Sequence, residues 1–122
     1  MQHPSKPLAK TRQGTLAGSA EQGIHIWRGI PYAAPPVGPL RWRAPQPPAR
    51  WHGVRQADAF SAASWQDIDY CRELGGGDPG RFSEDCLYLN VWAPASAAQP
   101  LPVMVWLHGG GFTIGAGSLP PY

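Results

Sequence analysis

The chain has 122 residues, of which 43% are hydrophobic and 15% charged, and its formal net charge at pH 7 is +2. This length suffices for one domain with a hydrophobic core. The basic residues are scattered, without a basic run or basic helix, which argues against a nucleic-acid partner. No stretch has the length of a membrane span and no secretory signal is recognisable, so we expect no membrane partner and a cytoplasmic protein, or a secreted one if the true start lies upstream.

The first residues predict a leader followed by a hairpin. Residues 1–10 are polar and contain two prolines, so we expect a disordered leader there and a folded portion at residues 11–122. Two short alternating runs, residues 14–18 and 24–27, are separated by a polar stretch and predict a β-hairpin. His25 lies on the opposite face from the isoleucines beside it and is interpreted as a solvent-facing strand residue.

Residues 29–50 are so rich in proline that a helix is excluded and an extended, stiff path is expected. Such a segment could be a ligand for a peptide-recognition module. We favour a rigid strap packed on the domain, because the segment carries too much apolar material for an exposed linker: Ile30, Tyr32, Val37, Leu40 and Trp42.

Residues 61–80 contain no convincing metal site. Asp67 and Asp69 are two carboxylates without further ligand spacing, which falls short of a calcium loop. The two cysteines of the chain, Cys71 and Cys86, permit one disulfide but do not require it.

Two apolar runs near the end of the chain predict neighbouring strands. Residues 87–92 form the first, stopped by Pro94, and residues 102–107 form the second, which is typical of a strand buried on both faces. The second run ends at a histidine followed by three consecutive glycines, residues 109–111. Loops at the carboxyl ends of strands are where α/β sheets build their sites.

A row of glycines can turn successive backbone N–H groups towards one point and so bind negative charge. In acyl transfer that charge is the oxyanion of the tetrahedral intermediate, where each aimed donor is worth about 3 kcal/mol. A plain turn is an alternative interpretation. A phosphate loop built on Gly111, Gly115 and Gly117 is disfavoured, because Pro120 and Pro121 resist the helix that such a loop should open.

Three motifs occur in an order and spacing that resembles the type B carboxylesterases, the branch of the α/β-hydrolase fold that includes the cholinesterases: residues 28–42, 83–92 and 102–112. The resemblance covers the chain from about residue 11 onwards. It implies an α/β fold, of which this chain is the N-terminal part with mostly strands and proline-rich loops. It also implies a serine hydrolase of small-molecule carboxylic esters that works through an acyl-enzyme and needs no cofactor.

The resemblance assigns roles to the glycine row. Gly110 and Gly111 would donate two backbone N–H groups to the oxyanion hole, and the third would come from the residue after the nucleophile. His108 and Gly109 would shape the turn, without a proton-transfer role for the histidine.

Other matches are structural. Arg41 and Glu84 match family positions that form an ion pair between the proline-rich strap and the loop before a strand. The family often carries a cysteine near Ser64, partnered with the one at Cys86. Since that position is serine here, a bridge between Cys71 and Cys86 is the remaining possibility.

The chain contains no Gly-x-Ser-x-Gly, so the nucleophile, acid and base are not found in it. We therefore expect an incomplete N-terminal portion of a carboxylesterase domain that is inactive alone, with strands whose apolar faces are bare and a tendency to insolubility. The alternatives are a non-catalytic binding or adhesion protein on the same fold, or an inactive truncated gene product. The sequence does not predict the oligomeric state.

Overall fold

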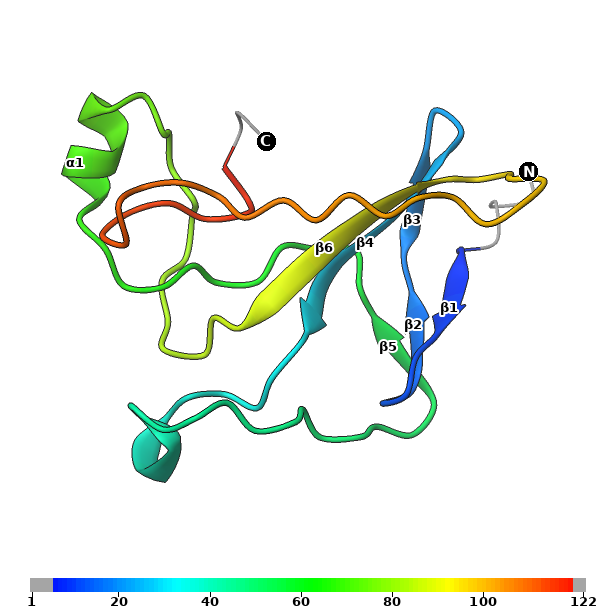
Figure 1. Ribbon diagram of the computed structural model, residues 1–122, viewed down its shortest axis with the longest axis horizontal. Coiled ribbons are helices and arrows are strands. Elements are labelled where there is room, and N and C mark those ends of the chain that lie inside the picture. Colours follow the sequence, from blue (N-terminus) through cyan, green and yellow to red (C-terminus); the bar gives the residue numbers. More distant parts are fainter. Residues whose placement is uncertain (1–5, 120–122) are drawn as a thin grey trace.

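The computed structural model describes residues 6–119, whose strands form two small sheets (Figure 1). The first sheet has the order β1-β2-β5, with strands Leu8–Lys10, Thr15–Ala17 and Val54–Gln56. The second has the order β3-β4-β6, with strands Ser19–Glu21, Ile24–Pro31 and Tyr88–Pro94. The remainder consists mainly of loops.

The first sheet overturns part of the predicted leader. β1 pairs antiparallel with β2, and the carbonyl of the buried Pro7 accepts a hydrogen bond of 2.9 Å from the N–H of Gly18. The disordered-leader prediction for residues 1–10 is therefore wrong for Leu8–Lys10, because backbone pairing orders a segment whatever the polarity of its side chains. Residues 1–5 lie outside the described residues.

The hairpin was predicted with the correct second strand and the wrong first strand. β3, rather than residues 14–18, pairs with β4 across a turn at Gln22 and Gly23, whose φ angles are 47° and 79°. Two-residue turns with positive φ match the twist of hairpin strands, so the Gln-Gly pair sets the register. Residues 15–17 instead pair with β1 and β5 in the other sheet.

The strand predicted at residues 87–92 is confirmed as β6, which pairs antiparallel with β4. The pairing register shifts between Trp27 and Ile30, where Gly29 has a φ of 71°. β6 is less buried than predicted, since Trp92 is 49% exposed.

The proline-rich segment follows an extended path with one 3₁₀ turn, Gly38–Leu40, and runs along the lower edge of the view in Figure 1. The prediction that it packs on the domain is wrong for Tyr32, Val37 and Trp42, which are exposed, whereas Ile30 and Leu40 are half-buried. Trp42 is 97% exposed and Tyr32 53% exposed.

A short helix, α1 (Ile68–Glu73), lies between β5 and β6 in the chain. The Asp67 carboxylate caps it by accepting hydrogen bonds from the N–H groups of Asp69 (3.0 Å) and Tyr70 (3.1 Å), which gives this aspartate a structural role. Cys71 on α1 is completely buried in a small core with Ala63, Ala116 and Leu119. Residues 6–119 contain no helix that could cross a bilayer and no cluster of three or more metal-ligating side chains.

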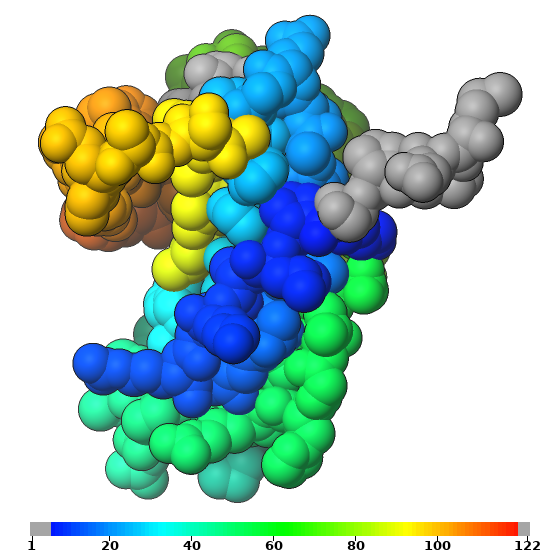
Figure 2. Space-filling model, turned by 90° about the vertical axis from the view of Figure 1, so that its right-hand side faces the viewer, coloured from blue at the N-terminus to red at the C-terminus, as the bar shows by residue number. Residues whose placement is uncertain are grey.

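The strand predicted at residues 102–107 does not form. These residues are irregular, and Val103, Met104 and Leu107 are 86%, 91% and 84% exposed. Figure 2 shows the corresponding orange segment projecting beside the body of the molecule. A β-strand forms only when a neighbouring strand pairs with its backbone N–H and C=O groups, and no strand of the described residues lies beside this segment.

Candidate functional site

The glycine loop, residues 108–117, is closed by a tight turn around one carbonyl. The Gly110 oxygen accepts hydrogen bonds from the N–H groups of Thr113 (3.0 Å) and Ile114 (3.1 Å). Gly110 and Gly111 have φ angles of 118° and 59°. A Cβ on Gly110 would collide with the carbonyl oxygen of Ile114, so the turn requires glycine at this position.

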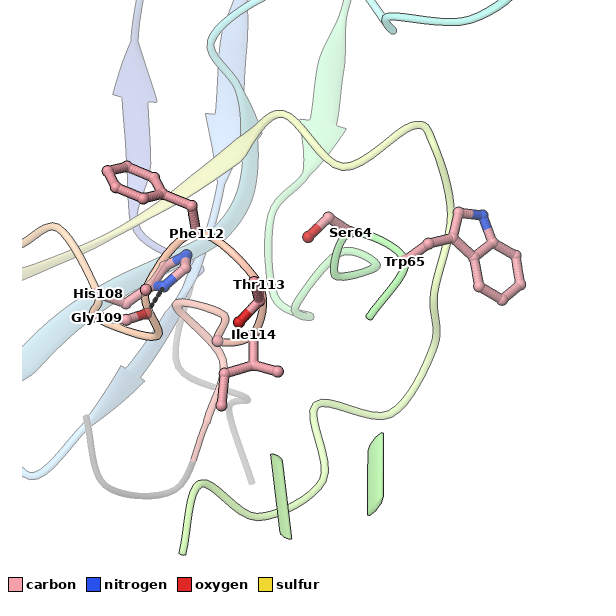
Figure 3. A pocket seen from close by; sticks show the side chains of 9 residues that line it. Ser64, Trp65, His108, Gly109, Phe112, Thr113 and Ile114 are labelled. Carbon is pink, nitrogen blue, oxygen red and sulfur yellow. Dashed lines mark hydrogen bonds between the residues drawn. The ribbon is translucent and has the colours of Figure 1, made fainter. Parts of the chain in front are cut away.

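Two backbone donors of this turn, at Gly110 and Gly111, are not used by the turn itself. Within residues 6–119, no hydrogen bond uses the N–H of Gly110 or Gly111. His108 is exposed, and its Nδ1 lies 2.8 Å from the carbonyl oxygen of Gly109, to which the Nδ1–H tautomer donates (Figure 3). The histidine ring thus contacts the backbone of the next residue in the loop.

A cavity of about 270 Å³ lies between the glycine loop and the segment before α1 (Figure 3). Its lining residues are Ser64, Trp65, His108, Gly109, Gly111, Phe112, Thr113, Ile114 and Gly115. The hydroxyl of Ser64 faces the loop, whereas the rings of Trp65 and Phe112 point away from it and are 70% and 111% exposed. Neither Ser64 nor Trp65 was predicted as a site residue, because no local sequence pattern indicates which loops lie side by side.

Two side-chain amides connect the glycine loop to the rest of the chain. Gln66 forms two hydrogen bonds with the backbone of Gly115, and Asn90 Nδ2 donates to the carbonyl of Gly117 at 3.2 Å. Neither amide was predicted as part of the site. They lie 49 and 27 residues from their partners, and none of the recognised motifs indicated these two contacts.

The structure brings Arg41 and Glu84 together. Arg41 Nη2 lies 2.6 Å from Glu84 Oε2, with 56% and 38% of the two side chains exposed. The hydrogen bond to this carboxylate raises the pKa of the Arg41 guanidinium above its ordinary value. Neither residue lines the cavity beside the glycine loop.

The structure does not contain the disulfide considered between Cys71 and Cys86, because both cysteines are free. Cys71 faces the small core under α1, whereas Cys86 is half-buried in the loop before β6. Burial, together with the charges of Asp85 and Glu84, raises the pKa of the Cys86 thiol.

The family model of the carboxylesterases matches residues 5–122. The chain belongs to the carboxylesterase family. It is 47% identical over 125 residues to phenmedipham hydrolase of Pseudarthrobacter oxydans, covering 97% of this chain and 24% of that protein. It is 48% identical over 115 residues to para-nitrobenzyl esterase of Bacillus subtilis, covering 94% and 23%. This carboxylesterase chain thus spans about a quarter of the length of these curated relatives.

Solved structures confirm the α/β-hydrolase fold class. A para-nitrobenzyl esterase structure superposes with a TM-score of 0.87 at 47% identity, covering 95% of this chain and 24% of that one. A carboxylesterase of Geobacillus stearothermophilus superposes with a TM-score of 0.77 at 41% identity, covering 91% and 21%. The resemblance stated from the sequence motifs is therefore confirmed, and the mostly β content is that of an N-terminal portion of this fold.

Proposed function

We propose that this chain supplies the oxyanion hole of a serine hydrolase acting on small-molecule carboxylic esters, while the nucleophile, acid and base lie outside the residues given. Family membership supports the ester-hydrolase part of the proposal. The names of the relatives agree with it, since they are described as an esterase or as hydrolases.

The observation that carries the site assignment is the pair of free donors at Gly110 and Gly111. Gly111 lines a cavity large enough for the carbonyl end of a small ester and Gly110 directly precedes it in the chain, and no described residue accepts a hydrogen bond from either N–H group. Donors fixed in advance stabilise the tetrahedral intermediate more strongly than water does, because they need no reorganisation when the charge develops. The turn around the Gly110 carbonyl fixes them in this way.

The experiment is a hybrid esterase, in which residues 5–122 of this chain replace the matching N-terminal segment of the Bacillus subtilis para-nitrobenzyl esterase. We expect this hybrid esterase to hydrolyse a p-nitrobenzyl ester, and the 122-residue chain alone to show no hydrolysis. A folded hybrid that binds the ester without turning it over would contradict the proposal and favour a non-catalytic binding protein.

A further inference from the structure

The side chain of Gln66 holds the glycine loop at one residue. Its Nε2 donates to the carbonyl oxygen of Gly115 at 2.9 Å, and its Oε1 accepts from the N–H of Gly115 at 2.8 Å. A second Nε2 hydrogen bond, of 3.1 Å, goes to the carbonyl of Ser64. One primary amide thus pairs with both backbone groups of Gly115 while it is anchored to its own segment, so its orientation is fixed.

Gly115 in turn determines where the start of the loop lies. It is buried, its φ is 110°, and a Cβ at this position would lie 2.5 Å from the Gly109 carbonyl oxygen and 2.6 Å from His108 Nδ1. The backbone of Gly115 therefore lies directly against His108 and Gly109, which precede the two free N–H groups in the chain. Displacing Gly115 would displace His108 and Gly109 with it.

We propose that Gln66 is a positioning residue of the ester-hydrolysing site, which acts by clamping Gly115 so that the N–H groups of Gly110 and Gly111 stay aimed at the substrate carbonyl. This inference rests on the proposed function. A glycine-rich loop gains more conformational freedom on release than any other sequence, so an unclamped loop would present its donors only part of the time. Catalysis depends on donors that are already in place.

Gln66 does not itself line the cavity, unlike its neighbours Ser64 and Trp65. Its replacement therefore removes no contact to the substrate in the ground state. An interaction that matters only when the oxyanion develops affects kcat rather than KM. The clamp thus predicts a specific kinetic signature.

The test compares Gln66→Ala and Gln66→Glu in the hybrid esterase. Gln66→Ala removes both hydrogen bonds to Gly115, whereas Gln66→Glu keeps an acceptor for the Gly115 N–H and loses the donor. Gln46→Ala is the matched control, because among residues 6–119 that exposed side-chain amide bonds only within its own loop, to the Ala44 carbonyl at 3.2 Å. Active-site titration gives the concentration of folded sites, so kcat is expressed per competent site.

We expect Gln66→Ala to lower kcat by about 10- to 100-fold with KM nearly unchanged, Gln66→Glu to fall between it and the parent, and the control to match the parent. Binding of a boronic acid, whose tetrahedral adduct mimics the oxyanion, should weaken in parallel. Deuterium exchange of residues 108–117 should accelerate in Gln66→Ala alone.

The two proposals fail in different ways. An inactive but folded parent hybrid overturns the proposed function and the clamp with it. An active parent in which Gln66→Ala raises KM, or changes only the concentration of titratable sites, leaves ester hydrolysis intact and overturns the positioning role.

Discussion

Arg41 and Glu84 form an ion pair of 2.6 Å between the proline-rich segment and the loop before β6, 43 residues apart in the chain. Trp42, next to Arg41 in the chain, is 97% exposed, so its side chain does not hold the proline-rich segment against the rest of the protein. The pair therefore sets the path of the proline-rich segment more than it contributes to packing.

Arg41→Ala should lower the melting temperature of the hybrid esterase slightly. The effect is small because solvent reaches both partners, and it should shrink at about 1 M salt, where such charges are screened. The exposed neighbour substitution Arg43→Ala is the control. The double exchange Arg41→Glu with Glu84→Arg should recover most of the loss, and an unchanged melting temperature in Arg41→Ala would contradict a structural role.

The glycine row should respond unequally to added side chains. A Cβ at Gly111 would meet no atom within 4 Å, so Gly111→Ala adds only the strain of a left-handed backbone conformation, about 1 kcal/mol. This substitution should therefore lower kcat of the hybrid esterase by less than about tenfold. Gly110→Ala collides with the Ile114 carbonyl and should cost about 100- to 1,000-fold, as expected for a lost oxyanion donor. Similar losses for both variants would mean that this turn does not aim the donors.

The family, and with it the glycine row and the Arg41–Glu84 pair, could be predicted because these features are carried by contiguous motifs. Of the β3–β4 hairpin only the second strand was predicted, because the first strand was placed at residues 14–18 and the tight turn at Gln22 and Gly23 was not recognised. Other partners that lie far apart could not be predicted, because no recognised family motif indicated their pairing. Gln66 pairs with Gly115 across 49 residues, and Leu8–Lys10 became a strand only because β2 lies beside it.

The exposed run at residues 102–107 was predicted as a buried strand and does not form one. Its apolar side chains do indicate burial, but burial and strand formation both need neighbours, and the chain spans about a quarter of its relatives. The apolar pattern thus indicates the buried environment that a longer domain would provide. In this structure the same run is exposed to solvent.

This difference predicts opposite effects of one substitution. Val105 is 77% exposed here, so Val105→Lys should reduce aggregation of the isolated chain in light scattering. In the hybrid esterase the same lysine would be an unpaired charge in a buried strand, and should cost about 4 kcal/mol of unfolding free energy. Gln99→Lys, in the exposed connector, should change neither protein. A hybrid that tolerates Val105→Lys would show that the run stays at the surface.

Cys86 should be slow to alkylate at neutral pH. Burial and the Asp85 carboxylate raise its thiol pKa, so the reactive thiolate forms only at more alkaline pH. A raised folded pKa also means that the contribution of this group to stability is present below the unfolded thiol pKa and is lost as pH rises through the folded value. Iodoacetamide labelling followed by mass spectrometry at several pH values measures the shift.

Asp85→Asn should move the labelling profile of Cys86 to lower pH, because it removes one of the charges that oppose the thiolate. Cys71, which is completely buried, serves as the internal control and should label only on unfolding. Labelling of both cysteines at the rate of a free thiol, or no response to Asp85→Asn, would contradict the structure of this loop.

Asn90 connects the irregular point of β4 to the glycine loop, since its Oδ1 accepts from the Gly29 N–H at 3.0 Å and its Nδ2 donates to Gly117. Gly29 is buried, so Asn90→Ala leaves its N–H without a partner and should cost about 1–3 kcal/mol in urea unfolding of the hybrid esterase. Asn90→Asp keeps this acceptor and should cost less, although it loses the donor to Gly117. If the aspartate variant is as unstable as the alanine variant, the stabilisation comes from the Gly117 contact instead, and the glycine loop rather than β4 depends on Asn90.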